Sequence, residues 1–309
     1  MPQSLPDLSI RQLEYLVAVA DSDTFALAAK QVGVSPSALS QGLAELERRV
    51  GVSLFDREGR RRVLRADTEP VLDHARQVVA LTADLADWAW RTRSGDHGRL
   101  RLGMIDASAV QHHGEALRQF RAEHPELRIH LRVGPSGDLL RELVDGSLDL
   151  AVCVEPAERP RGVSTEVLLT EDLAIYAPDG RRNPGPSAGW GPWVLFPRNA
   201  HTRSGIEAAL RRRGAPVEVV AESHQPEVLC EMVRLGLGWS VLPVVQAEWG
   251  EQPLVRCEIL ARRQLVIARR SGAAPHPAGL LLEQALRENW AGSLAPSAPA
   301  TKGEPHEQR

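Results

Sequence analysis

One short stretch near the N-terminus carries small polar side chains at a spacing that suits contact with DNA bases. Ser35 and Pro36 are typical of a helix start, because a serine hydroxyl caps free N–H groups and proline tolerates the first helical position. In the helix that follows, Ser37, Ser40 and Gln41 face away from the apolar positions. Serine and glutamine side chains can reach adenine or guanine edges in the major groove. These five residues are therefore candidate DNA-binding residues.

Three arginines follow shortly afterwards. Arg57, Arg60 and Arg62 surround Gly59, which marks a turn between two short extended pieces. Such a thin β-wing can place arginine in a narrow minor groove or against phosphates. A run of charge is more often only a solvated surface. This one lies beside a candidate base-reading helix, and the combination favours DNA.

Hydroxyl, imidazole and guanidinium groups recur later, in loops that follow predicted strands and precede predicted helices. Ligands of open α/β sheets bind at such loops, outside the carboxyl ends of the strands, where helix N–H groups point outward. Any one of these side chains is as well explained by a helix cap or a surface position. The candidates for ligand contact are Ser108, Ser136, His201, Thr202, Arg203 and His224.

The helices that carry the candidate DNA-binding residues at 35–41 are predicted to form a helix-turn-helix. An amphipathic helix at 10–20 precedes it. Ala28 and Ala29 allow two helices to cross closely, and Gly33 can take the positive φ of a tight turn. Later apolar residues recur at helical spacing and can pack inward, namely Ala38, Leu39, Leu43 and Leu46. An ordinary helical hairpin is the alternative interpretation, since such hairpins are common.

A long helix is predicted over residues 69–93. Its apolar residues nearly follow a heptad, and they are Val71, Leu72, Ala75, Val78, Val79, Leu81, Leu85 and Trp88. A heptad suits pairing with the same helix of a second subunit, which would present two recognition helices to a partly palindromic site. Packing of this helix on its own domain is the alternative.

From residue 99 onward, the pattern alternates between strands and helices. The first part is a βαβαβ run, so we expect a mostly parallel sheet. A second lobe is predicted from about residue 161, and the chain then returns to the first lobe and ends in a helix. The predicted elements are strands 100–105, 127–133, 148–154, 173–176, 193–196, 217–221, 240–243, 253–260 and 264–269, and helices 109–123, 139–144, 204–213 and 226–235.

Residues 8–93 resemble the LysR-type transcriptional regulators, in the order first helix, helix-turn-helix, wing and linker helix. The matching residues are Leu13, Phe25, Ala28, Ala29, Val34, Ser35, Ala38, Leu39, Ser40, Leu46, Glu47, Gly51, Leu54, Phe55, Arg57 and Arg60. Residues 138–152 and 233–243 resemble recurrent patterns of the effector domain of that family. The sequence departs from the family at Gln41, where a basic residue is frequent, and at 64–70, the entry to the linker helix.

The resemblance implies an α/β protein with a winged helix-turn-helix, a long linker helix and a two-lobed effector domain similar to periplasmic solute-binding proteins. The expected divisions are a DNA-binding domain at 1–66, a linker helix and hinge at 67–98, an effector domain at 99–290 and a disordered tail at 291–309. The matching family positions place Ser108, Ser136 and the loop at 201–203 in the effector cleft. Hydroxyls, imidazoles and one fixed guanidinium favour a small organic anion, because arginine holds a carboxylate through two hydrogen bonds.

These features imply a ligand-responsive transcriptional regulator that binds an inverted repeat in double-stranded promoter DNA as a homodimer or homotetramer. The alternative is a cytoplasmic small-molecule-binding module whose N-terminal helices serve only assembly. We expect no enzyme activity, since the chain has no GxSxG, HExxH or phosphate-binding glycine loop. We also expect no cofactor and no metal site.

Whole-chain properties agree with this interpretation. The net charge of −3 requires DNA contact to come from a local patch. No apolar segment approaches membrane-spanning length and no signal peptide is evident, so a cytoplasmic location is expected. Cys153, Cys230 and Cys257 lack metal spacing. Some regulators of this family sense oxidants through a cysteine pair, but buried structural cysteines are the favoured interpretation.

Overall fold

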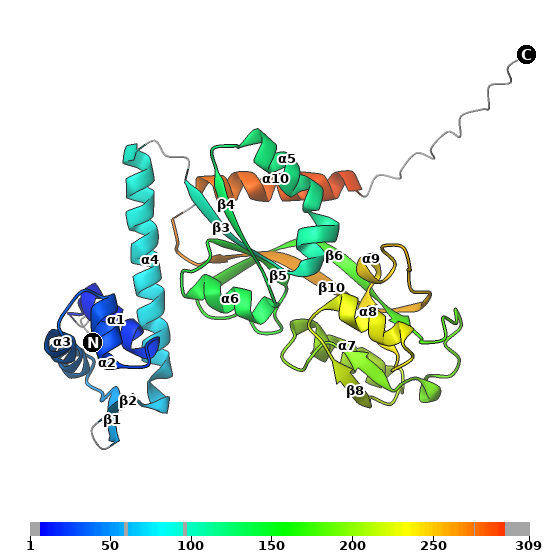
Figure 1. Ribbon diagram of the computed structural model, residues 1–309, viewed down its shortest axis with the longest axis horizontal. Coiled ribbons are helices and arrows are strands. Elements are labelled where there is room, and N and C mark those ends of the chain that lie inside the picture. Colours follow the sequence, from blue (N-terminus) through cyan, green and yellow to red (C-terminus); the bar gives the residue numbers. More distant parts are fainter. Residues whose placement is uncertain (1–6, 59–60, 95–97, 275, 294–309) are drawn as a thin grey trace, which may run out of the picture.

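The computed structural model describes residues 7–58, 61–94, 98–274 and 276–293 of the 309-residue chain (Figure 1). The predicted helix-turn-helix is present, and a two-stranded wing and the long linker helix follow it. The elements are α1 (Ile10–Ala20), α2 (Phe25–Gln31), α3 (Pro36–Val50), β1 (Phe55–Glu58), β2 (Arg61–Leu64), a short 3-10 turn (Ala66–Thr68) and α4 (Glu69–Ser94).

Side-chain caps set the ends of the N-terminal helices. Ser9 and Gln12 form a reciprocal capping box at the start of α1. Thr24 caps α2 in the same way that Ser35 caps α3, and Pro36 occupies the first turn of α3. The α3 helix ends at Gly51, which has a positive φ of 80° that other residues rarely adopt. The caps at Ser9 and Ser35 were predicted from the sequence, and α1 has the predicted bounds.

The linker helix α4 serves two surfaces along its length. Its first half packs on its own DNA-binding domain, where Leu72 and Ala75 are buried in the core formed with α1 and α3. Its second half presents Leu85 and Trp88 to solvent, with exposures of 58% and 44%. The first half therefore packs on its own domain, and pairing of the second half with another subunit stays a prediction.

The first lobe of the effector domain contains the predicted parallel βαβαβ run. Its elements are β3 (Arg99–Met104), a π-helical turn (Ser108–His112), α5 (Gly114–Glu123), β4 (Arg128–Val133), α6 (Ser136–Val144) and β5 (Leu150–Val154). β3 pairs in parallel with both β4 and β5. The single helix predicted over 109–123 is wrong, because the chain forms the π-helical turn, bends at His113 and then begins α5.

Two long strands run between the lobes, namely β6 (Val163–Tyr176) and β10 (Arg256–Arg270). Within the described residues, the largest sheet has the order β4-β3-β5-β10-β6-β9, and β10 pairs antiparallel with both of its neighbours. The sequence predicted two separate strands where β10 is one. The residues at its centre are polar and the β6–β10 pairing is irregular, with register shifts at Ile259/Ala261 and Leu265/Val266.

The second lobe surrounds a separate apolar core that includes Tyr176 and Trp193, both fully buried. Its elements are β7 (Trp193–Leu195), α7 (His201–Arg212), β8 (Val219–Glu222), α8 (Pro226–Arg234), β9 (Ser240–Pro243) and α9 (Val244–Ala247), with a short 3-10 turn at Ser187–Gly189. The last helix, α10 (Pro277–Ser293), returns to the first lobe and lies beside α5 (Figure 1).

Across the parts of the chain that the structure describes, no helix is both long enough and apolar enough to cross a membrane. Three expectations fall at least partly outside the described residues. These are the turn of the wing, at 59–60, part of the predicted linker helix and hinge, at 95–97, and nearly all of the predicted disordered tail, at 294–309.

The close approach of Gly238 to a backbone carbonyl provides a test of the second lobe. A Cβ atom at this position would lie 2.6 Å from the Pro192 carbonyl oxygen, and Trp239 N–H donates to the same oxygen at 2.7 Å. We expect Gly238→Ala to lower the free energy of unfolding by about 1–3 kcal/mol. Urea denaturation followed by tryptophan fluorescence measures the change.

Gly205→Ala is the matched control, because Gly205 lies within α7 with nothing within 4 Å of a new Cβ. This substitution should stabilise the protein by about 0.5–1 kcal/mol through helix propensity. Equal effects of the two substitutions would contradict the packing of the loop at 191–193 on Gly238.

Candidate DNA interface and effector cleft

The first turns of α3 present the predicted polar residues. The Ser35 hydroxyl accepts from Ala38 N–H at 3.2 Å and lies 2.9 Å from the Ser37 hydroxyl. Ser37 and Gln41 are exposed and lie one helical turn apart, whereas Ser40 is half-buried. The apolar side of the helix is fixed by Leu39, Leu43 and Leu46, whose side chains are fully buried. The polar side of α3 is therefore held toward solvent by its own core.

The wing forms where the sequence predicted it. β1 and β2 pair antiparallel, and Arg57 lies opposite Arg62 in the register. The side chains of these two arginines, and the whole of Arg60, lie outside the described residues. At the base of the wing, Arg65 forms ion pairs with Asp56 at 3.1 Å and with Asp67 at 2.9 Å. The sequence analysis missed this arginine, which anchors the wing to the start of α4.

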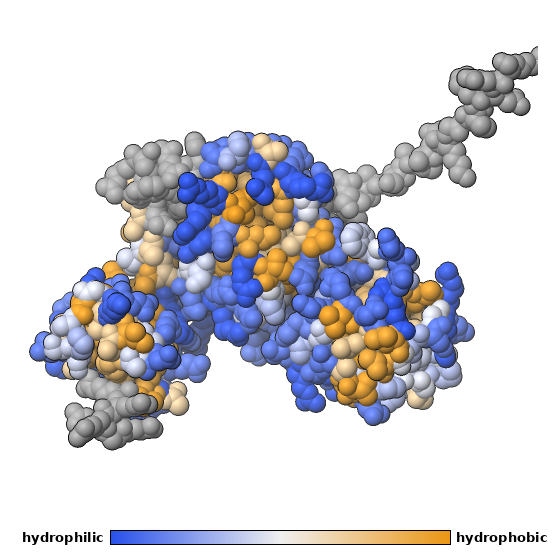
Figure 2. Space-filling view, viewed as in Figure 1, coloured by the Kyte–Doolittle hydropathy of each residue, from blue (hydrophilic) through white to orange (hydrophobic). Residues whose placement is uncertain are grey.

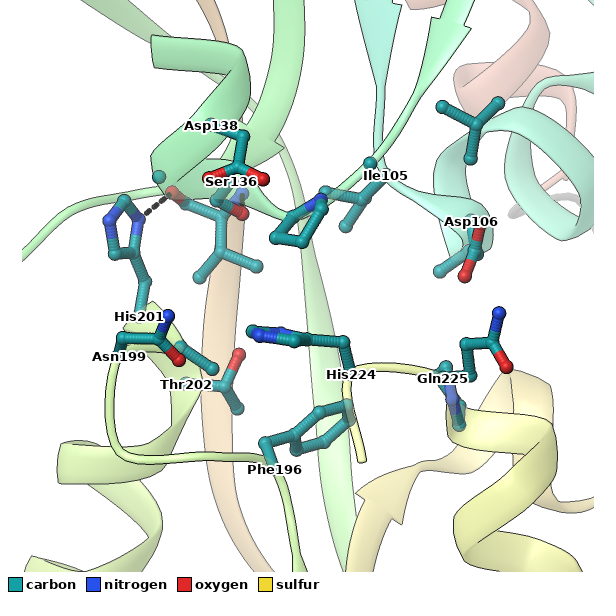
Figure 3. Close-up of a pocket in the computed structure, with 18 of the residues that line it drawn as sticks. Ile105, Asp106, Ser136, Asp138, Phe196, Asn199, His201, Thr202, His224 and Gln225 are labelled. Atoms are coloured by element: carbon teal, nitrogen blue, oxygen red, sulfur yellow. Dashed lines mark hydrogen bonds between the residues drawn. The ribbon is translucent and has the colours of Figure 1, made fainter. Parts of the chain in front are cut away.

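A cleft of about 300 Å³ lies between the two lobes (Figure 3). Its walls come from the loop after β3 and the N-terminal ends of α6, α7 and α8. Four of the predicted ligand contacts line it, namely Ser136, His201, Thr202 and His224. In both lobes, loops that follow strands therefore contribute to the walls of this cleft.

Hydrogen bonds hold two of these residues in place. The Ser136 hydroxyl accepts from Val154 N–H at 3.1 Å, which leaves its own proton for a ligand. His201 Nδ1 lies 3.2 Å from the Val154 carbonyl oxygen, shown as a dashed line in Figure 3. Because His201 begins α7 of the second lobe and Val154 ends β5 of the first, this contact joins the lobes at one end of the cleft.

The other two predicted contacts, Ser108 and Arg203, are buried and do not line the cleft. Ser108 begins the π-helical turn and is fully buried. Arg203 is also buried, because α7 begins three residues earlier than predicted and turns its side chain inward. Its guanidinium donates to Glu207 and Glu222, each at 2.8 Å, and to the Phe196 carbonyl. Arg203 is therefore a structural ion-pair centre of the second lobe.

Arg263 of β10 is one of three arginines that line the cleft, with Arg132 and Arg141, and the sequence analysis missed it. Arg263 Nε donates to Glu171 at 2.6 Å and Nη1 donates to the Thr202 hydroxyl at 3.0 Å. The other oxygen of Glu171 lies 2.9 Å from His112 Nε2. Burial opposes ionisation of Glu171, but Arg263 and His112 outweigh it and hold the pKa of this carboxyl below its usual value.

Further polar groups of the cleft were also missed. The side-chain amide of Gln246 is 7% exposed, lines the cleft, and has no hydrogen-bond partner among the described residues. Asp106 follows β3, lines the same cleft and is half-buried. Neither residue belongs to a sequence motif. Asp106 lies two residues before Ser108 in a loop that the sequence predicts at the cleft, but only Ser108 was chosen as a candidate contact.

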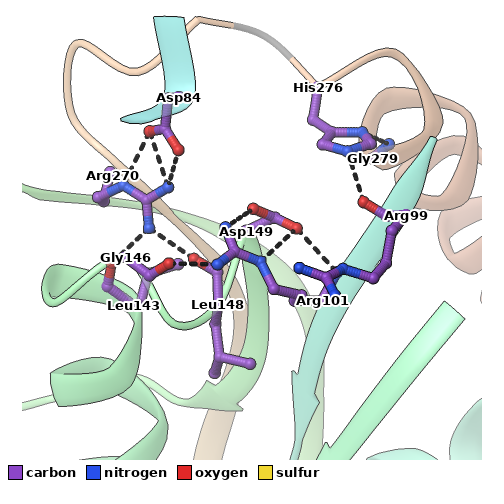
Figure 4. Close-up of polar contacts among 10 residues, drawn as sticks. All are labelled: Asp84, Arg99, Arg101, Leu143, Gly146, Leu148, Asp149, Arg270, His276 and Gly279. Atoms are coloured by element: carbon purple, nitrogen blue, oxygen red, sulfur yellow. Dashed lines mark hydrogen bonds and ion pairs between the residues drawn. The ribbon is translucent and has the colours of Figure 1, made fainter. Parts of the chain in front are cut away.

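The first lobe is joined to the linker helix by a buried ion pair (Figure 4). Arg270, at the end of β10, binds Asp84 of α4 through Nε at 3.0 Å and Nη2 at 2.5 Å. Its Nη1 donates to the carbonyls of Leu143 and Leu148, which flank the C-terminal end of α6. The other end of α6 carries Ser136 into the cleft. One helix thus reaches from the cleft to the linker.

Within the described residues, no group of three or more His, Cys, Asp or Glu side chains is arranged to hold a metal ion. The polar groups that line the cleft are hydroxyls, imidazoles, amides, guanidinium groups and carboxylates. The cleft has the character of a binding site for a small polar molecule.

Comparison with known proteins agrees with the fold and its two parts. Among curated proteins, the HTH-type transcriptional regulator IlvR of Caulobacter vibrioides is 27% identical over 285 residues, which cover 89% of this chain and 96% of IlvR. A full-length OxyR variant from Pseudomonas aeruginosa matches with a TM-score of 0.64 at 22% identity, covering 91% of this chain and 95% of OxyR.

The LysR family regulator CbnR in complex with its target DNA matches with a TM-score of 0.58 at 19% identity, covering 91% of this chain and 100% of CbnR. Two family profiles match as well. Residues 10–67 match the bacterial regulatory helix-turn-helix protein, lysR family, and residues 93–291 match the LysR substrate binding domain. The chain therefore belongs to the LysR family of DNA-binding transcriptional regulators, which carry an effector-binding domain and are not enzymes.

Proposed function

We propose that this regulator reads an inverted repeat in promoter DNA through Ser37 and Gln41 of α3. The observation that carries the proposal is the placement of these two exposed side chains on one face of α3, one turn apart, opposite a fully buried leucine face. Glutamine can bind adenine through two hydrogen bonds in the major groove. Ser35 and Pro36 form the start of the helix, and Ser40 is a further candidate base contact. The wing arginines Arg57, Arg60 and Arg62 contact phosphates or the minor groove.

The proposed assembly is a homodimer formed through the second half of α4, with a further pairing into a tetramer. Leu85 and Trp88 lie three residues apart on this helix, so their exposed side chains share one face. Burying such side chains against a second copy is favourable by about 1.5–3 kcal/mol each. Apolar side chains also reach the surface of the effector domain over both lobes (Figure 2), where a further copy can pack.

We propose that a small organic effector binds between the lobes and changes how the paired heads sit on the promoter. Support comes from the lining of the cleft by Ser136, His201, Thr202 and His224, and from α6, which joins the cleft to the linker helix. A ligand that prefers one lobe arrangement shifts the DNA equilibrium by its difference in affinity, and DNA shifts ligand affinity by the same factor.

The cysteines favour an effector over an oxidant as the signal. All three are free, and burial raises the pKa of the Cys153 thiol to about 12 and that of Cys230 to about 11. The thiolate is the species that reacts with oxidants, and it is scarce at neutral pH when the pKa is raised. Cys257 is partly exposed, and its thiol donates to the Arg181 carbonyl at 3.0 Å.

Gln41→Ala tests the recognition face. Selection of fragments from the source genome at near-physiological salt should enrich intergenic inverted repeats with the wild type. The variant should bind those sites about 5- to 100-fold more weakly, since a bidentate base contact is worth about 1–3 kcal/mol. Gln119→Ala, on the exposed surface of α5, removes the same amide far from α3 and should leave binding unchanged. Unchanged DNA affinity and selectivity of Gln41→Ala would contradict the assignment of α3 as the recognition helix.

Leu85→Glu tests the proposed dimer. A charge on the exposed face of α4 should raise the dimer dissociation constant at least about tenfold, because charged groups are costly to bury without a partner. Sedimentation equilibrium measures this change. Ala83→Glu adds the same charge at another exposed position of α4 and is the control. Dissociation by both variants alike, or by neither, would place the dimer contact elsewhere.

Alkylation rates test the redox alternative. At pH 8, iodoacetamide should label Cys153 and Cys230 at least about tenfold more slowly in the folded protein than in urea. The labelling rates should rise with pH toward the raised pKa values, since the thiolate fraction grows there. Cys257 is the internal comparison and should react faster. A peroxide-induced disulfide that alters DNA affinity would overturn the assignment of an effector as the signal.

A further inference from the structure

Most of the charged side chains that line the cleft have a partner of opposite charge. Among the described residues, the cleft is lined by three arginines, and each has a carboxylate partner. Arg132 lies 3.4 Å from Glu142, Arg141 pairs with Asp138, and Arg263 lies 2.6 Å from Glu171. These pairs leave no guanidinium without a counter-ion in the described wall. An effector anion therefore does not find an unmatched arginine there.

Asp106 is the exception to this pairing. It and Asp138 are the carboxylates of the described cleft lining, and Asp138 is held by Arg141. Asp106 makes no hydrogen bond or ion pair with the described residues, and burial raises its pKa. A partly desolvated carboxylate without a partner is costly unless a cation or a hydrogen-bond donor meets it. In Figure 3 its oxygens point across the cleft toward Gln225 of the second lobe.

The other end of the cleft has the opposite character. α6 and α7, with 9 and 12 residues, begin there with no side-chain cap, so their first N–H groups face the space around Ser136 and His201. Helix N-terminal ends attract anions through these N–H groups and the helix dipole. Figure 3 shows Ser136 and His201 at one side of the cleft and Asp106 at the other, with His224 between them.

Gln246 supplies an independent sign that a ligand belongs in this space. Both polar atoms of its amide are buried without a partner among the described residues, although the side chain lines the cleft. Buried amides normally have hydrogen bonds, because an unmade bond costs about 1–3 kcal/mol. A polar ligand that reaches this amide would supply the hydrogen bonds that the described residues do not.

From this charge arrangement we infer that the effector is an extended amino carboxylate. Its carboxylate lies at the N-terminal ends of α6 and α7 beside Ser136, and its ammonium group lies against Asp106. The separation of the two sites across the cleft favours an ammonium group several bonds from the carboxylate over an α-amino group. This inference rests on the proposed effector function and narrows the organic anion to a zwitterion.

Matched probes test the inference on the full-length protein. The probes are 6-aminohexanoate, its isomer L-norleucine with the ammonium beside the carboxylate, hexanoate without the ammonium, and adipate with a second carboxylate instead. Isothermal titration should give an affinity for 6-aminohexanoate at least about tenfold above that for the other three. Equal affinity for hexanoate, tighter binding of adipate, or no heat with 6-aminohexanoate would overturn the inference. Tighter binding of L-norleucine would overturn the placement of the ammonium.

Substitutions at Asp106 test whether this carboxylate causes the preference for 6-aminohexanoate. Asp106→Asn should bring 6-aminohexanoate and hexanoate to within about twofold of one another, and Asp106→Arg should reverse the order in favour of adipate. Asp138→Asn is the control, because it removes a paired carboxylate of the same cleft and should keep the preference for 6-aminohexanoate. A preference unchanged in Asp106→Asn would place the ammonium elsewhere.

A separate measurement distinguishes failure of this inference from failure of the proposed function. Melting temperature and affinity for the selected promoter fragments are followed with a pool of cellular metabolites. If the pool changes either quantity while the amino carboxylates do not bind, the effector function stands and the zwitterion is wrong. If neither the pool nor any probe has an effect, both proposals are wrong.

Discussion

The antiparallel pairing of β6 with β10 is the constraint on which the effector domain depends. The pairing extends from Arg256 opposite Tyr176 to Arg270 opposite Val163, so both lobes are built on the same two strands. Each lobe nevertheless has its own apolar core. The cleft therefore lies where two independently packed units share a continuous ladder, and changes in lobe angle must be absorbed by these strands.

The same ladder connects the cleft chemistry to the linker helix. Arg263 lies opposite Glu171 in the register, so strand pairing itself brings this charge pair together at the cleft. Seven residues along β10, roughly 23 Å in an extended strand, Arg270 binds Asp84 of α4. The side chain of Arg270 is 5% exposed, and removing one partner of such a buried pair leaves a costly unpaired charge. The ion pair between Arg270 and Asp84 therefore depends on the register in which β10 pairs with β6.

The N-terminal domain was predictable to within a few residues because local chemistry decides it. Ser35, Pro36 and Gly51 set the ends of α3 through capping, and leucine spacing sets its buried face. The continuous β10 was not predictable, because its pairing with β6 depends on residues about 90 positions apart. The error at Arg203 has the same origin. An early start of α7 turned a predicted loop residue inward, where partners distant in sequence hold it.

The cleft shows why residue type alone is a poor guide to ligand charge. The sequence analysis counted an arginine and inferred an anion, but the arginines that line the described cleft are each matched by a carboxylate. A paired arginine presents a hydrogen-bonding surface with little net charge, so the field in the cleft is set by groups whose partners are missing and by helix ends. Pairing is a property of the folded chain, because Glu171 and Arg263 are brought together by strand register and are far apart in sequence. The charge that selects a ligand is thus decided by what the fold leaves unpaired.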